Sequence, residues 1–97
     1  MDKIAGHRKE IDQIHKELYT LLQRRRDSVM AIWKIKQATA MPFFNAEREQ
    51  QILQDFVKLS ENSGTDPQFD ELTSAVMNTI LREYEKYLRS KFPQGSE

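Results

Sequence analysis

Residues 4–35, "IAGHRKEIDQIHKELYTLLQRRRDSVMAIWKI", decide the fold class of this 97-residue chain. Apolar side chains recur in this stretch at the spacing of one helix face. They form two heptad columns, one of Ile4, Ile11, Leu18 and Ile32 and the other of Ile14, Leu21 and Ile35. From Asp2 to Ala40 there is no proline, and only Gly6 disfavours a helix. The pattern predicts one very long helix over about residues 2–40.

Two shorter helices are expected after it, which makes the fold all-α. Met41-Pro42 ends the first helix, because a residue before proline is pushed out of the α region. Asn45 is a candidate N-cap for a helix over about 46–61. Its buried face is expected to contain Ile52, Leu53, Phe56 and Val57.

A third helix is expected after the break "NSGTDP", in which Gly64 lies at a helix end. Asp66 and Pro67 suit its N-cap and first position, so we expect it over about 67–91. One face carries Phe69, Leu72, Val76, Ile80, Tyr84 and Leu88. Residues 93–97 are expected to be frayed.

The proportions of the three helices predict an oligomer. The length suits a single domain over residues 1–97. A helix of that predicted length measures roughly 50 Å, whereas a compact domain of this size has a radius of gyration near only about 13 Å. The two shorter helices cannot cover both ends of such a rod, so an intertwined two-fold homodimer is the simplest solution. The alternative is a first helix that kinks near Gly6 or the arginines and packs as a monomer.

Composition excludes several classes of function. Lys plus Arg equals Asp plus Glu, 15 each, so no bulk charge attracts nucleic acid or a membrane. The absence of cysteine excludes disulfides and thiolate chemistry, and His7 and His15 lack the accompanying carboxylates of a metal site. No apolar run approaches the roughly 20 residues that span a bilayer. The N-terminus carries no targeting segment, which indicates a cytoplasmic location.

The three arginines at 24–26 interrupt the apolar stripe. The first heptad column passes from Leu18 through Arg25 to Ile32, while Arg24 and Arg26 fall to either side and reach water. A lone charge on a packed seam costs several kcal/mol unless it is paired. Arg25 therefore snorkels, pairs with a carboxylate of a partner helix, or binds an anionic ligand. A nucleic-acid contact is disfavoured, because acids balance these arginines and no aromatic residues are interleaved with them.

Other charges favour the ligand. Lys36 lies eleven residues beyond Arg25, within about 20° of the same face and about 16 Å further along the axis. Glu49 shares the apolar face of the second helix, with Arg48 beside it. Arg8 points elsewhere on the first helix and can serve only the groove of a second chain. This set suits a small, multiply anionic molecule with a hydroxyl group, acted on through positioning and electrostatic stabilisation.

The order "HRKEIDQIHKELYTLLQRRRDSV", "KIK" and then "MPFFNAEREQQIL" resembles the all-helical chorismate mutases, most densely over residues 7–56. The resemblance implies an isomerase of aromatic amino acid biosynthesis in the shikimate pathway, which rearranges the dicarboxylate chorismate to prephenate without a cofactor or metal. It also implies a homodimer. In such an enzyme Arg25 holds one substrate carboxylate, and Lys36 donates to the ether oxygen. Arg8 of the other chain grips the second carboxylate.

The same resemblance assigns residues of the second and third helices. Glu49 accepts a hydrogen bond from the ring hydroxyl, Arg48 lies beside it, and Asn45 replaces an aspartate at the mouth of the pocket. On the third helix the family usually has a serine and, four residues later, a glutamine or glutamate. Here Ile80 and Tyr84 occupy these positions, with Glu83 adjacent. Either both residues pack in the core, or the Tyr84 hydroxyl replaces the amide donor.

The departures on the third helix leave other functions open. Enzymes of the same fold act on isochorismate, as isochorismate-pyruvate lyases do, or on 4-amino-4-deoxychorismate. A regulatory module that binds the dianion without chemistry is a further alternative, and a helical dimerisation domain without a pocket is the last.

Overall fold

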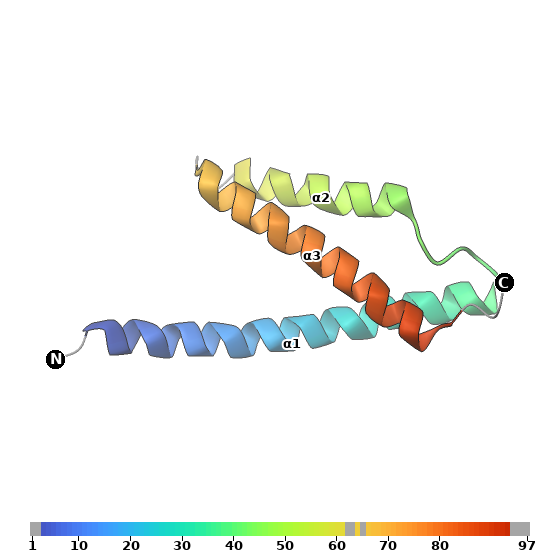
Figure 1. Ribbon diagram of the computed structural model, residues 1–97, viewed down its shortest axis with the longest axis horizontal. Helices are drawn as coiled ribbons and strands as arrows, with labels where there is room; N and C mark the ends of the chain where they lie inside the picture. Colours follow the sequence, from blue (N-terminus) through green and yellow to red (C-terminus); the bar gives the residue numbers. More distant parts are fainter. Residues whose placement is uncertain (1–2, 62–63, 65, 94–97) are drawn as a thin grey trace. The chain divides into compact units, whose positions relative to one another are not determined.

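The computed structural model describes residues 3–61, 64 and 66–93. It is all-α and contains three helices: α1 (Lys3–Ala38), α2 (Ala46–Glu61) and α3 (Pro67–Lys91) (Figure 1). The predicted all-α fold with a long first helix is confirmed. Asp2, the predicted start of the first helix, and residues 94–97 of the predicted frayed tail lie outside the described residues. The chain divides into two compact units, Met1–Ile35 and Lys36–Glu97.

The first unit consists of α1 up to Ile35. The seven side chains of its two heptad columns are between 47% and 62% exposed. Trp33 is the buried residue of this helix, and it lies outside both columns. The helix runs without interruption through Gly6 and the three arginines.

A Schellman turn ends α1 two residues before the predicted boundary. The amide of Met41 donates to the carbonyl of Lys36 at 2.8 Å, and that of Ala40 donates to the carbonyl of Gln37 at 3.4 Å. Ala40 takes the left-handed conformation of this motif, with φ of 57°. Pro42 follows, as is common after such a turn.

Side-chain caps begin the other two helices, as predicted. The Oδ1 atom of Asn45 accepts from the amide of Arg48 at 3.1 Å at the start of α2. Asp66 caps α3 and accepts from the amide of Phe69 at 3.2 Å, with Pro67 as the first helical residue. Gly64, between these helices, has φ of 99°, a conformation that favours glycine.

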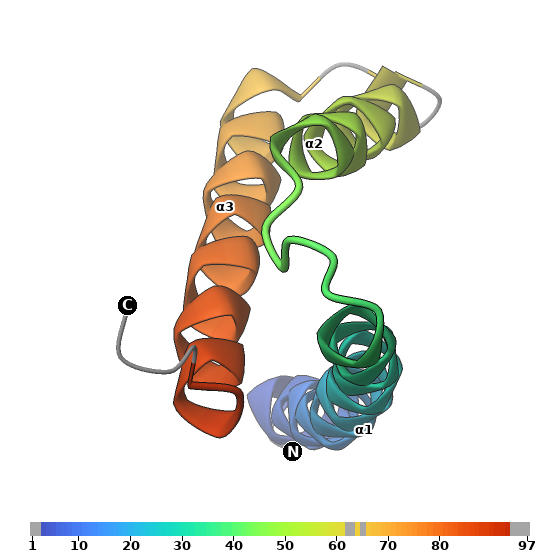
Figure 2. The same cartoon turned by 90° about the vertical axis from the view of Figure 1, so that its right-hand side faces the viewer.

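In the second unit α2 packs against α3, and the two run in opposite directions from their connected ends (Figures 1 and 2). Ile52, Leu53 and Phe56 are half-buried as expected, but Val57 is exposed and was wrongly assigned to the core.

The predicted face of α3 is buried only toward its C-terminal end. Leu88 is buried and Ile80 and Tyr84 are half-buried, whereas Phe69, Leu72 and Val76 are about half exposed. Met77 and Leu81, which lie outside the predicted face, are buried. Apolar residues occupy a wide arc of this helix, and the contacts within the chain cover only one side of that arc.

Candidate functional site

The candidate site residues are distributed over both units. Arg8 and Arg25 belong to the first unit, and the second contains Lys36, Asn45, Arg48, Glu49, Ile80 and Tyr84.

The three consecutive arginines of α1 differ in their surroundings. Arg24 is exposed, and Arg26 forms an ion pair with Asp27 at 2.9 Å. Arg25 is half-buried, and its Nη1 atom is buried. Arg26 is half-buried as well, so the burial of whole residues separates Arg24 from the other two arginines and does not single out Arg25. Arg8, near the start of the same helix, is exposed.

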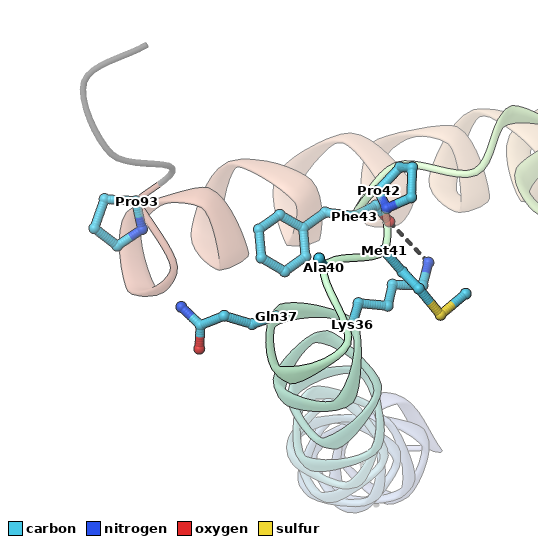
Figure 3. Close-up of a pocket in the computed structure, with 7 residues that line it drawn as sticks. All are labelled: Lys36, Gln37, Ala40, Met41, Pro42, Phe43 and Pro93. Carbon is cyan, nitrogen blue, oxygen red and sulfur yellow. Dashed lines mark hydrogen bonds between the residues drawn. The ribbon is translucent and has the colours of Figure 1, made fainter.

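Lys36 is fixed by the segment that follows its helix. Its Nζ atom donates a part-buried hydrogen bond of 2.9 Å to the backbone carbonyl of Phe43 (Figure 3). A lysine ammonium has three donors, so this bond leaves two for other acceptors. The long, flexible stem of the side chain is thereby held in one direction.

A pocket of about 430 Å³ opens beside this lysine. It is lined by Lys36, Gln37, Ala40, Met41, Pro42, Phe43 and Pro93 (Figure 3). The end of α1, the connection to α2 and the residue after Phe92 thus meet around one hollow. Small-molecule sites commonly have volumes of roughly 300–1,000 Å³.

The start of α2 holds three candidate residues in one turn. The side chain of Asn45 caps the helix by accepting from the backbone amide of Arg48. The Arg48 side chain is exposed and Glu49 is half-buried, as expected for an acid that turns toward the apolar face. Glu47 and Glu49 in the first turn are also favourably placed against the helix dipole.

On α3, Ile80 and Tyr84 are both half-buried. Glu83 is exposed and forms ion pairs with Arg82 at 3.4 Å and with Lys86 at 3.6 Å. These surface contacts favour Tyr84 over Glu83 as the residue that reaches toward the interior. Ile80 offers no hydrogen-bonding group.

A family model for chorismate mutase type II matches residues 7–87. The chain belongs to this family. Comparisons with curated proteins and with solved structures each found no match. The matched range contains all eight candidate residues, from Arg8 to Tyr84. Chorismate mutases of this type are isomerases that act on chorismate.

Sequence reasoning missed Phe43 and Phe92. Both are buried, at 8% and 6% exposure, although each lies outside a helix. Their rings contact each other with centroids 5.9 Å apart. The aromatic pair "FF" after the helix break and the aromatic before Pro93 were the available signals, but neither position repeats with a helical period.

Two further observations concern other kinds of site. Within the described part of the chain, no three His, Asp or Glu side chains gather in a way that could hold a metal ion. No helix among the described residues is both long enough and apolar enough to span a bilayer.

Proposed function

We propose that this chain is a chorismate mutase that converts chorismate to prephenate. The observation that carries the proposal is the family match over residues 7–87, which includes cations at positions 8, 25, 36 and 48 and the acid at 49. In the reaction the ether C–O bond breaks as a C–C bond forms within one molecule. No proton or electron is gained or lost, so the protein contributes positioning and electrostatic stabilisation alone.

Each residue has one role in this proposal. Arg25 binds a substrate carboxylate, and Lys36 donates to the ether oxygen, where negative charge develops. Glu49 accepts from the ring hydroxyl, with Arg48 beside it and Asn45 at the mouth of the site. On α3, Ile80 packs against the substrate and the Tyr84 hydroxyl provides a second donor to the ether oxygen.

The active form in this proposal is an intertwined homodimer, and Arg8 of the second chain binds the other carboxylate. The half-exposed heptad columns of α1 support this arrangement, because about 20 cal/mol or more of stabilisation is available for each Å² of apolar surface that a second copy covers. A residue at position 8 is then distant from its own site and close to its neighbour's.

An assay with matched variants tests the catalytic assignment. The wild-type protein should consume chorismate saturably and form prephenate. Arg25→Ala and Lys36→Ala should each lower kcat/KM by a factor of about 10²–10³. The control variants Arg24→Ala and Lys34→Ala, at exposed neighbouring positions, should keep the kcat/KM of the wild type. Circular dichroism should show equal helicity in all four variants. If Arg25→Ala reacted as fast as the wild type, the assignment would fall.

Mixing two inactive variants tests the shared site. Arg8→Ala and Arg25→Ala chains are unfolded together and refolded, which forms mixed dimers with one intact site each. About a quarter of the wild-type activity should return, because half of the dimers are mixed and one of their two sites is complete. No recovery in correctly dimeric mixtures would show that Arg8 serves its own chain.

The α3 positions favour a second candidate, a module that binds such dianions without catalysing the reaction. Ile80 cannot donate a hydrogen bond, and Tyr84 differs from the family's usual amide. Chorismate, isochorismate and 4-amino-4-deoxychorismate should therefore be offered in parallel, with calorimetry on each. Tight binding without turnover at high protein concentration would favour the module, and turnover of one analogue alone would redefine the substrate.

A further inference from the structure

Lys36 is held by a chain of contacts that begins at the C-terminal end of α3. The carbonyl oxygen of Phe43 accepts a hydrogen bond from the Nζ atom of Lys36 at 2.9 Å. Phe43 itself is buried. The neighbouring Phe44 is 45% exposed, so burial is specific to Phe43 and is not shared by the whole connection. The direction of the lysine therefore depends on what holds Phe43.

The ring of Phe43 contacts the ring of Phe92. The two rings are tilted by 49° with centroids 5.9 Å apart, within the usual range for aromatic pairs. In Figure 3 the carbonyl of Phe43 points to Lys36, and its ring points to the side on which Pro93 lies. A shift of the Phe43 ring would consequently move the acceptor of the lysine.

The position of Phe92 is itself well determined. Its amide donates to the carbonyl of Leu88 at 2.8 Å, which closes the end of α3, and Leu88 is 3% exposed. Pro93 disfavours the helical conformation for the residue before it, and Phe92, with φ of −125° and ψ of 67°, lies outside the helical region. The ring of Phe92 is thus presented at a fixed place by the helix end.

We propose that Phe92 is a positioning residue for the ammonium of Lys36, acting through the ring and the carbonyl of Phe43. The inference rests on the proposed function for its catalytic meaning. A donor contributes most when it is oriented before the charge develops, so one held on a rigid support is more effective than a mobile lysine. The phenylalanine lies beyond the matched residues 7–87.

Kinetics of Phe92→Ala, with Phe44→Ala as the matched control, give the first measurement. Removal of the Phe92 ring should lower kcat about tenfold with little change in KM, less than the 10²–10³ expected for outright loss of a donor. Phe92→Leu, which keeps apolar bulk, should recover part of the loss. In a Lys36→Met background the substitution at 92 should have no additional effect, because the two residues act as one unit. An equal loss in both backgrounds would show a merely structural role and overturn the proposal.

Chemical reactivity of the lysine gives a second measurement that needs no turnover. Limited reductive methylation of the full chain, followed by peptide mass spectrometry, compares Lys36 with exposed Lys34 on the same helix. The ratio of modified Lys36 to modified Lys34 should rise severalfold in Phe92→Ala and stay constant in Phe44→Ala. Should Phe92→Ala not fold, Phe92→Leu carries the comparison, with a smaller rise expected.

The two measurements separate the possible failures. Normal turnover of chorismate by the wild type with an unchanged methylation ratio in the folded variant refutes the link between Phe92 and Lys36 alone. No turnover by the wild type refutes the proposed function, and with it the catalytic meaning of the link.

Discussion

Ala40 is a position where the structure predicts a gain in stability from a single substitution. Its φ of 57° lies in the left-handed region, at the C′ position of the Schellman turn that ends α1. This conformation costs an L-residue roughly 1–2 kcal/mol, and glycine adopts it without that penalty. Glycine loses about 0.5–1 kcal/mol more in conformational entropy on folding. Ala40→Gly should therefore stabilise the protein by about 0.5–1 kcal/mol.

Thermal unfolding followed by circular dichroism measures this difference. For a domain of this size, the gain corresponds to a rise in Tm of roughly 2–8 °C. The protein concentration must be held constant, since the Tm of an oligomer depends on it. Ala31→Gly is the matched control: the same change at an exposed position inside α1 should cost about 1 kcal/mol. A fall in Tm for Ala40→Gly similar to that of the control would refute the assignment of the turn.

Three further substitutions test the cap, the third helix and the exposed stripe. Asp66→Ala removes the acceptor of the Phe69 amide and should lower the free energy of unfolding by about 1 kcal/mol in urea titrations. Asp66→Asn keeps an acceptor and should retain most of the stability. Tyr84→Phe should lower kcat by about tenfold or more if the hydroxyl is a donor to the ether oxygen, and an unchanged kcat would assign the side chain to packing. Leu18→Glu places a charge on the apolar columns and should weaken the proposed dimer in sedimentation equilibrium. A dimer of wild-type stability would show that the columns are not its interface.

The helix boundaries were predictable because local interactions determine them. Asn45 and Asp66 cap helices through amides only three residues away, so the residue types and their spacing were sufficient. The end of α1 was less predictable. A glycine would have marked the left-handed position, but alanine occupies it, and the boundary was placed at about residue 40 in place of Ala38.

The buried faces were predicted less well than the boundaries. Along α3, apolar side chains occur both at Leu72 and Val76 and at Met77 and Leu81. Helical periodicity is satisfied by either set, and only the packing partner decides between them. Within this chain, α2 is the partner, and Met77 and Leu81 are buried. Val57 on α2 was misassigned for the same reason.

The candidate site shows the same division between local pattern and tertiary contact. Arg25 was identifiable because it replaces an apolar residue in a periodic column, and a charge there requires a counterpart whatever the function. Lys36 was identifiable from its register to Arg25 on one helix. The contacts that support Lys36 were not identifiable from the sequence. Its acceptor is a backbone carbonyl, which every residue type has, and Phe92 is separated from Phe43 by the whole of α2 and α3. A helix can place a lysine on the correct face, but the direction of its ammonium is then set by residues distant in sequence. Substitutions at such supporting positions are therefore expected to change kcat without appearing in any motif.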